Sequence, residues 1–342
     1  VITPEDVIVP NGETSKVKAN ISAIKLAKQL ESEKRDATPT EKKILAQYTG
    51  WGGLPKIFER EWGNDWANKY GVHADELKSI LTKEEWQAAK ESTINAHYTA
   101  RGIIDSMWKI ADKLGFKGGN VLEPAGGIGH FFGIMPEKFA KKSYLYGHEL
   151  DNISGLIFSK LYPQAKVSVS GYETSTIPNN SMDMVITNVP FGSVKVYDKA
   201  NKDISDFQIH NFFIAKSLRK LKPGGLGVFI TTSATMDNEG AGKKFRTWVN
   251  SEEGGNSDLV DAIRLPNNAF KENAGTEVTT DILVFRKRTG EKHPESKQFI
   301  NTESIKDATT KDGQPTQIRV NEYFAKNPSR MLGEMKLAHE AG

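Results

Sequence analysis

Residues 122–132 read Leu-Glu-Pro-Ala-Gly-Gly-Ile-Gly-His-Phe-Phe, and this stretch decides the fold. The apolar run before it predicts a strand that ends in Glu123, and the glycine-rich turn then opens a helix. Glycine lets a backbone approach a ligand closely, and a helix N-terminus offers unpaired N–H groups. The spacing is neither the dinucleotide fingerprint nor a phosphate loop. An acidic strand end instead suits a ligand that carries positive charge, and the alternative is an ordinary glycine-rich turn between strand and helix.

The same alternation of short apolar runs and helical stretches continues outward from this turn. Strands are predicted at residues 120–123, 143–149, 166–170, 182–188, 225–233, 258–265 and 281–287. Helices are predicted between the early strands, at residues 152–161 and 207–221. This alternation indicates an α/β fold with a mostly parallel sheet covered on both faces. The last two strands have no convincing helix between them, which favours an antiparallel pair at one edge.

The first 94 residues predict a mostly helical extension. Thr38 with Glu41, and Thr82 with Glu85, have the spacing of capping boxes that open short helices. Residues 21–30 are amphipathic, and the glycines and proline of YTGWGGLP end the helix before Gly50. We therefore predict three parts: an extension over residues 1–94, a main domain over residues 95–290 and a polar C-terminal appendage over residues 291–342.

Composition limits the class of protein. The 342 residues are 37% hydrophobic and 26% charged, which is typical of a globular protein with a substantial core. No apolar run approaches the roughly 18 residues that would cross a bilayer, and the N-terminus has no signal-peptide pattern. Cysteine is absent, which excludes disulfides and thiolate metal sites and favours a reducing, cytoplasmic location. Because the chain lacks an initiator Met, we expect it to be a piece of a longer polypeptide.

A second acidic strand end follows the first. Glu149 in YGHELD ends the predicted strand 143–149. A carboxylate at this place accepts hydrogen bonds from ribose hydroxyls in nucleoside-binding α/β folds. Helix capping is the alternative, for which Asp151 is equally well placed. Two acidic strand ends in succession favour a ligand of the adenosine type.

The stretch DMVITNVPFG, residues 183–192, adds a third feature at the same edge. The Asn188 amide oxygen and the Val189 carbonyl can both accept hydrogen bonds, and Phe191 offers a flat apolar face. Pro190 holds the preceding residue in an extended conformation. This group suits a planar ligand that bears an NH₂ group, and the alternative is a turn followed by a core phenylalanine. Ligands of open α/β sheets bind outside the carboxyl ends of the strands, where all three motifs are predicted to lie.

Together these motifs resemble the N6-adenine methyltransferases that use S-adenosylmethionine. E-P-A-G-G-I-G is similar to their cofactor motif, and N-V-P-F is similar to their [D/N/S]-P-P-[Y/F] catalytic motif. The segment at residues 95–108, LKPGGLGVFIT and RLPNNAF resemble further motifs, and the motif order resembles the γ arrangement. The resemblance covers roughly residues 95–287. YTGWGGLPKIF and the NVPFG form also resemble helicase–methyltransferase fusion proteins of phages and conjugative elements, a context of restriction-modification or anti-restriction.

The resemblance implies a Rossmann-like seven-stranded methyltransferase sheet with an antiparallel edge hairpin. It implies that the residues holding S-adenosylmethionine are Tyr98, Thr99, Glu123, Pro124, Ala125, Gly126, Gly127, Gly129, Glu149, Leu150 and Glu173. It implies a catalytic motif of Asn188, Val189, Pro190 and Phe191, in which Asn188 and the Val189 carbonyl bind the target amine. Phe191 would stack on the target base, and Phe270 on its other face.

Two positions depart from the family pattern. Val189 stands where most DNA enzymes have proline, but the role there belongs to a backbone carbonyl. Related rRNA adenine dimethylases also have a non-proline apolar residue there, which keeps RNA open as a substrate. Tyr172 stands where an acidic residue is usual after the third strand, and Glu173 follows it.

The sequence thus predicts a site-specific DNA methyltransferase that modifies adenine N6 in a flipped base. The alternatives are methylation of RNA adenine or of protein glutamine, or a non-catalytic module that binds cofactor or DNA. We expect no metal, because no histidine pair has ligand spacing. Helicase or target-recognition domains of the same parent chain are the expected partners. Cationic candidates for DNA contact, each of which could instead be a solvated face, are residues 243–248, residues 286–288 and Lys195, Lys199 and Lys202.

Overall fold

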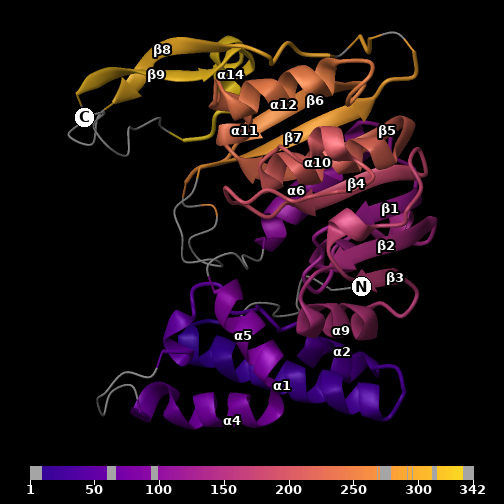
Figure 1. Ribbon diagram of the computed structural model, residues 1–342, viewed down its shortest axis with the longest axis vertical. Coiled ribbons are helices and arrows are strands. Elements are labelled where there is room, and N and C mark those ends of the chain that lie inside the picture. The colour runs from indigo at the N-terminus through magenta and orange to yellow at the C-terminus, as the bar shows by residue number, and fades with distance from the viewer. Residues whose placement is uncertain are drawn as a thin grey trace. The chain divides into compact units, whose positions relative to one another are not determined.

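The computed structural model shows a large mixed sheet, a helical N-terminal region and a C-terminal hairpin (Figure 1). It describes residues 10–59, 67–93, 99–267, 269, 279–290, 292–294, 296–309 and 314–333. The contacts divide the chain into two compact units. Unit 1 includes Glu123–Ser175 and the described residues up to Trp108, and unit 2 includes Lys109–Leu122 and most of the chain from Thr176 onward.

Seven strands form one sheet in the order β3-β2-β1-β4-β5-β7-β6. Their bounds are β1 (Gly119–Glu123), β2 (Ser143–Glu149), β3 (Lys166–Val169), β4 (Met182–Asn188), β5 (Leu221–Thr232), β6 (Ser257–Arg264) and β7 (Thr280–Lys287). β4 pairs in parallel with β1 and β5, and β2 with β3, whereas β7 is antiparallel to both β5 and β6. The sheet confirms the predicted Rossmann-like seven-stranded fold with an antiparallel edge pair.

The central strands β4 and β5 each contain a run of consecutive apolar residues because both of their faces are covered. Val185 and Ile186 of β4 are fully buried, as are Val228 and Phe229 of β5. A strand covered on one face only would alternate between apolar and polar side chains. The continuous apolar run therefore predicts β4 correctly, from Met182 to Asn188.

In unit 2, three helices follow the central strands. They are α10 (Ile209–Lys220), α11 (Ala234–Asp237) and α12 (Ala241–Asn250), and the short turn η4 (Lys202–Ile204) precedes them. α10 packs on β4, β5 and α12, and both α10 and α12 lie over the strands in Figure 1. Nearly every side chain of α10 is buried, including Phe212 and Ile214.

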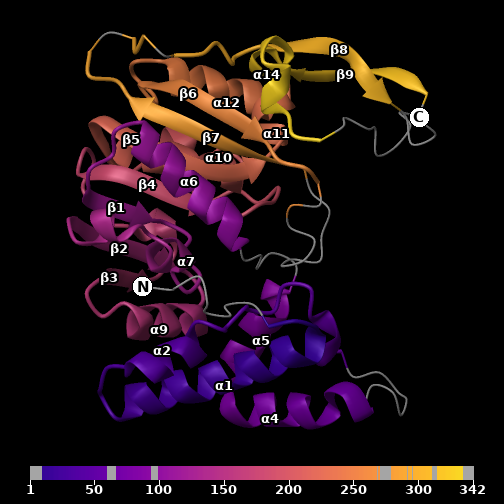
Figure 2. The same cartoon turned by 180° about the vertical axis from the view of Figure 1, so that it is seen from behind.

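Unit 1 begins with the helical region that the sequence predicts. Its elements are α1 (Glu13–Ser32), α2 (Pro39–Leu45), η1 (Pro55–Ile57), η2 (Ala67–Gly71), α4 (Val72–Ile80), α5 (Lys83–Ser92) and the start of α6 (Arg101–Lys113). Both predicted capping boxes are present, at Thr38 with Glu41 and at Thr82 with Glu85. The helical N-terminal extension is thereby confirmed, and Figure 2 shows these helices from behind.

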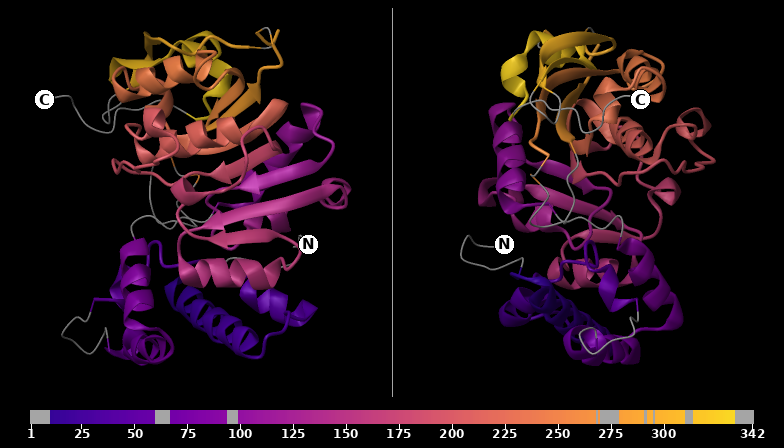
Figure 3. Two further views of the ribbon diagram at one scale, coloured as in Figure 1. Left: turned by 45° about the vertical axis from the view of Figure 1, so that its right-hand side comes forward. Right: turned by 90° about the vertical axis from the view of Figure 1, so that its left-hand side faces the viewer.

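Unit 1 continues with α7 (His130–Gly133), α8 (Glu137–Ala140), α9 (Asn152–Leu161) and η3 (Tyr172–Thr174). α9 has the bounds that the sequence predicts, and Asp151 caps it by accepting a hydrogen bond from Ser154 N. α1 packs against α9 and α4 through a buried apolar stripe that includes Ile21, Ile24 and Leu30. Figure 3 shows the magenta α9 beside the indigo α1.

The C-terminal part contains a hairpin that the sequence does not predict. β8 (Thr302–Thr309) and β9 (Pro315–Asn321) pair in antiparallel fashion, and α14 (Glu322–Lys326) and η5 (Pro328–Arg330) follow. Asn321 is fully buried, and its Nδ2 donates hydrogen bonds to the carbonyls of Met236 at 2.9 Å and Phe299 at 2.8 Å. The predicted boundaries after residues 94 and 290 remain predictions. None of the helices within the described ranges combines the length and apolarity that a bilayer crossing needs.

Candidate active site

The glycine-rich turn after β1 wraps around one aromatic ring. Phe158 of α9 is fully buried, and a Cβ added to Gly126, Gly129 or Gly147 would overlap its ring. Gly129 also has a φ of 81°, in the left-handed region that favours glycine. The glycines are therefore required by packing inside unit 1, a reason that no local sequence pattern indicates. The ring holds the backbone of the turn against β2, where Gly126 N donates to His148 O at 2.9 Å.

We expect Gly126→Ala to destabilise the protein by about 1–3 kcal/mol, because overpacking a rigid core forces the ring or the turn to move. Cofactor affinity should fall as well, because the turn shifts. Phe158→Leu in the same chain should restore part of both losses. Gly102→Ala is the matched control, since a Cβ there meets nothing within 4 Å. Urea unfolding and calorimetric titration measure both effects, and an unchanged Gly126→Ala variant would contradict the packing argument.

Glu149 at the end of β2 is tied to this turn. Its carboxylate accepts hydrogen bonds from Gly127 N at 2.7 Å and from Asp151 N at 2.8 Å. Each carboxylate oxygen has two lone pairs, so both can accept a further hydrogen bond. Burial raises the pKa of Glu149 to about 7 even though these backbone N–H groups favour the ionised form. The predicted ribose contact therefore has a positioned acceptor.

Glu123 at the end of β1 is buried, and no cationic side chain in the described part of the chain forms an ion pair with it. Only 1% of its surface is exposed, and its Oε2 accepts no hydrogen bond within the described part of the chain. Burial and the nearby Glu149 together raise the pKa of Glu123 well above its usual value. A cationic ligand group would offset both effects. These two carboxylates thus fit S-adenosylmethionine, which carries an ammonium group and ribose hydroxyls, and their individual roles in binding remain predictions.

We expect cofactor affinity to rise roughly tenfold between pH 6 and pH 8, because binding needs Glu149 ionised and its pKa lies near 7. Proton uptake also links this group to folding. The pKa of Glu149 is about 4.5 in the unfolded chain and about 7 in the folded protein. The contribution of Glu149 to folding stability is therefore fully present below pH 4.5 and is lost as the pH rises through about 7. Calorimetric titration with the cofactor in buffers of different ionisation enthalpy measures the proton that Glu149 releases on binding. Glu149→Gln should remove the part of the pH dependence that is centred near pH 7, and a flat profile in the native chain would contradict the prediction.

The remaining predicted cofactor residues lie in unit 1 where they are described. Thr99 and Pro124 are buried, and Ala125 is half-buried. Leu150 is exposed, which leaves its apolar surface open to a ring. Tyr98 lies outside the described residues. Their roles in cofactor binding remain predictions.

The end of β3 departs from the family pattern in a specific way. Tyr172 is buried and packs edge-on against His148, with 5.4 Å between ring centroids. The half-buried Glu173 folds its carboxylate back over Gly171, where a Cβ would overlap it. Tyr172 is therefore a core residue, and a contact between Glu173 and the cofactor remains a prediction.

The NVPF motif lies in unit 2, at the carboxyl end of β4. Asn188 is half-buried and pairs with Ile230 of β5, and Val189 N donates to Ile230 O at 3.1 Å. The side chain of Val189 is buried, whereas Pro190 and Phe191 are half-buried. Val189 thus acts as a core anchor, and the proposed acceptor at this position is its main-chain carbonyl. Phe270 lies outside the described residues.

The β1–β4 register brings two predicted strand ends to one edge. Val121 pairs with Met184 and Leu122 with Val185 in parallel. Glu123 ends β1 and Asn188 ends β4, so both strands finish at the same edge of the sheet. This is the edge at which open α/β sheets bind ligands.

Two of the three cationic clusters serve the fold. Arg246 is fully buried, and its guanidinium donates to the carbonyls of Thr235, Asn238 and Ile300. Arg288 is bound to Asp258 at 2.6 Å, and Lys287 donates to Gly255 O at 2.8 Å. The prediction of DNA contact at residues 286–288 is therefore wrong for these two cations, and at residues 243–248 it is wrong for Arg246. Lys195, Lys199 and Lys202 are exposed.

Several structural side chains near the motif carry no local sequence signal. The hydroxyls of Thr231 and Thr235 lie 2.9 Å apart, and Thr235 donates to Asn211 Oδ1 at 3.0 Å. His210 is buried, and burial lowers its pKa to about 4, so its imidazole is neutral. Within the described ranges, no group of three or more His, Cys, Asp or Glu residues could hold a metal ion.

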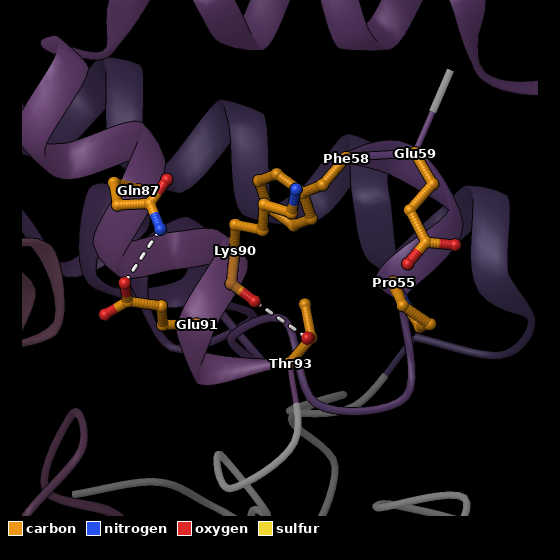
Figure 4. Close-up of a pocket in the computed structure, with 7 residues that line it drawn as sticks. All are labelled: Pro55, Phe58, Glu59, Gln87, Lys90, Glu91 and Thr93. Carbon is orange, nitrogen blue, oxygen red and sulfur yellow. Dashed lines mark hydrogen bonds between the residues drawn. The ribbon is translucent and has the colours of Figure 1, made fainter. Parts of the chain in front are cut away.

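A pocket of about 320 Å³ lies in the helical region and is lined by residues between Pro55 and Thr93 (Figure 4). Phe58 and Pro55 supply its apolar wall, and Phe58 packs on Trp86 at 5.0 Å between ring centroids. Gln87 is bonded to Glu91 along α5, at 2.7 Å. No residue of the predicted site lines this pocket, so it does not compete with the strand ends as the candidate site.

Comparisons with known proteins agree with these motifs. Over 222 residues, which are 64% of this chain, the chain is 28% identical to "Defense against restriction protein B" of Escherichia phage P1. The chain matches only 9% of that protein's length.

Solved structures with a similar fold are more distant. One is a Listeria monocytogenes protein described as a class I S-adenosylmethionine-dependent methyltransferase, with 17% identity and a TM-score of 0.49 over 82% of this chain and 90% of that chain. Another is a type I restriction-modification methyltransferase subunit from Streptococcus thermophilus, with 14% identity and a TM-score of 0.47 over 81% of this chain and 70% of that chain.

The family model described as "Eco57I restriction-modification methylase" matches residues 67–254, more than half of the chain. The match includes the glycine-rich turn, Glu149 and the NVPF motif. The predicted resemblance to S-adenosylmethionine-dependent DNA methyltransferases, in a restriction-modification or anti-restriction context, is thereby confirmed. The chain belongs to the Eco57I restriction-modification methylase family.

Proposed function

We propose that this chain transfers the methyl group of S-adenosylmethionine to the N6 amine of adenine in DNA, with the target base flipped out of the duplex. The observation that carries the proposal is the NVPF motif at the carboxyl end of β4, beside the parallel strand β1 that ends in Glu123. Family membership supports methyl transfer in a restriction-modification context.

The cofactor would be held by this chain's own acidic strand ends. Glu123 is suited to its ammonium group, Glu149 to its ribose hydroxyls, and the exposed Leu150 to its adenine. When bound, S-adenosylmethionine supplies an electrophilic methyl group on a sulfonium sulfur. The buried surroundings of Glu123 exclude water from its carboxyl.

The target amine would be oriented by the NVPF motif. Adenine N6 is a poor nucleophile because its lone pair is delocalised into the ring. Asn188 Oδ1 and the Val189 carbonyl would accept hydrogen bonds from its two N–H groups and favour a pyramidal nitrogen. The methyl group would pass from the sulfonium sulfur to N6, and the amine would give up one proton to solvent. Holding amine and methyl group in line supplies much of the rate.

The base must leave the duplex to reach this motif. Flipping costs a few kcal/mol and is repaid in part by stacking on an aromatic side chain. Phe191 is half-buried, so part of its ring remains open to a base. Sequence recognition, and any helicase function, would belong to other parts of a parent protein.

The test is to identify the methylated atom. The protein is incubated with donor labelled in the methyl group and with genomic DNA from a strain that lacks adenine methylation. We expect label in N6-methyladenine after digestion to nucleosides. DNA that is already methylated at N6 is the matched control and should take up no label. Label on cytosine, on RNA or on protein glutamine would contradict the proposal, as would cofactor binding without any transfer.

A further inference from the structure

The loop that follows the catalytic motif, residues 192–206, exposes two large apolar side chains that lie close together in the sequence. Tyr197 is 69% exposed and Val194 is 64% exposed. Lys195, Lys199 and Lys202 stand among them and are exposed as well. Lys195 is loosely paired with Asp206 at 3.6 Å, which leaves Lys199 and Lys202 as the stronger candidates for phosphate contact.

A buried carboxylate, that of Asp198, organises the backbone of this loop. Asp198 is 1% exposed, and its carboxylate accepts hydrogen bonds from the backbone of Ala200 and Asn201, from Asn201 Nδ2 at 2.8 Å and from Lys216 Nζ at 2.6 Å. Burial alone would raise the pKa of Asp198, but the bonds from Lys216 and Asn201 hold it below its usual value. The carboxylate therefore stays ionised and holds the loop in one shape.

Both ends of the loop are also held. Gly192, directly after Phe191, has a φ of 151°. Ile209 N donates to Val194 O at 2.9 Å, and the main chains of Lys195 and Gln208 form an isolated antiparallel β-bridge. Farther along, Arg219 bonds both Asn201 and Asp203, and its guanidinium lies 5.3 Å from the Trp248 ring. Because the loop is held at both ends and at its centre, little conformational entropy remains to be lost when a partner binds.

We propose that the 192–206 loop is a preformed contact surface for the DNA strand next to the target base, with Tyr197 stacking on an unpaired base and Lys199 and Lys202 on phosphates. An exposed ring between cations is the arrangement by which proteins bind unstacked nucleotides. Tyr197 lies six residues after Phe191 in the chain, on the segment that connects the catalytic motif to α10. This inference rests on the proposed function, since flipping a base leaves its neighbours unstacked.

The experiment measures DNA affinity without turnover, by fluorescence anisotropy of a labelled duplex with a mismatch at the target adenine. Stacking of one base predicts that Tyr197→Ala weakens binding about tenfold. Tyr197→Phe keeps the ring and should bind nearly as well as the native chain. Tyr144→Ala is the matched control, because Tyr144 is 74% exposed at the amino end of β2. Affinity for S-adenosylmethionine should stay within about twofold for all three variants, since none touches the cofactor residues.

The lysines give a second readout. Replacing Lys199 and Lys202 with glutamine should lower the slope of log affinity against log salt by about two, since each phosphate contact contributes about 0.9. The inference is overturned when Tyr197→Ala binds DNA as well as Tyr144→Ala does, or when its loss appears with single-stranded RNA and not with DNA. Failure of the proposed function is a separate result, namely binding of DNA by the native chain with no label on adenine N6.

Discussion

Replacing Asn188 with alanine is expected to lower kcat/KM for DNA about 100- to 1,000-fold, as loss of one positioned transition-state hydrogen-bond partner does in other enzymes. The change corresponds to about 2.7–4 kcal/mol of transition-state stabilisation. Affinity for S-adenosylmethionine and the free energy of unfolding should hardly change, because the pairing of Asn188 with Ile230 uses the main chain. Steady-state kinetics with labelled donor measures the loss, and calorimetry measures the cofactor affinity.

Asn188→Asp is the control for this prediction, since a carboxylate keeps an acceptor at the same place. It should retain clearly more activity than the alanine variant. Equal activity of Asn188→Ala and the native chain would remove the amide from the mechanism. Loss of folding in Asn188→Ala would instead assign it a structural role, which its half-buried position does not predict.

Replacing Arg264 with leucine is expected to cost about 3–5 kcal/mol of folding stability, because it leaves the buried carboxylate of Asp281 without its cation. Arg264 is 2% exposed at the end of β6 and Asp281 of β7 is fully buried. The guanidinium binds Asp281 in bidentate fashion at 2.8 and 2.9 Å and Asp237 at 2.8 Å. It also lies 4.5 Å from the ring of Phe324 in α14.

Urea denaturation measures this loss as a change in the free energy of unfolding. Lys141→Ala removes an ion pair with Glu137 in which both side chains are largely exposed, and should change stability by less than about 0.5 kcal/mol. A loss below about 1 kcal/mol for Arg264→Leu would show that the buried pair contributes little. Asp281→Asn should also destabilise, which separates loss of charge from loss of the arginine's volume.

Local patterns predicted much of the fold. β2, β4 and α9 have the predicted bounds, and both capping boxes formed as expected. These features depend on residues within about one helical turn of each other, so a single sequence carries their signal. β5 begins at Leu221, four residues before its predicted start, because Leu221 pairs with Met182 across the sheet.

Features that depend on distant partners were not predictable. The sequence of the β8–β9 hairpin is polar and predicts no strands. The hairpin is held instead by contacts with distant residues, such as the hydrogen bond from Asn321 to the Met236 carbonyl. The sequence predicts Arg246 and Arg288 to be surface charges. Both are buried in the structure, because their hydrogen-bond and ion-pair partners are distant in the sequence. A charged residue has no pattern that distinguishes a solvated face from a buried pair.

The sequence by itself determined the order of strands and helices, the acidic strand ends Glu123 and Glu149, and the NVPF motif after β4. These follow from period, turn residues and motif spacing, all of which are local. Only the tertiary structure decided why the turn needs its glycines, since the ring that excludes a Cβ belongs to Phe158 on another element. It also decided which cations remain exposed, because burial and pairing depend on what the fold brings near each side chain.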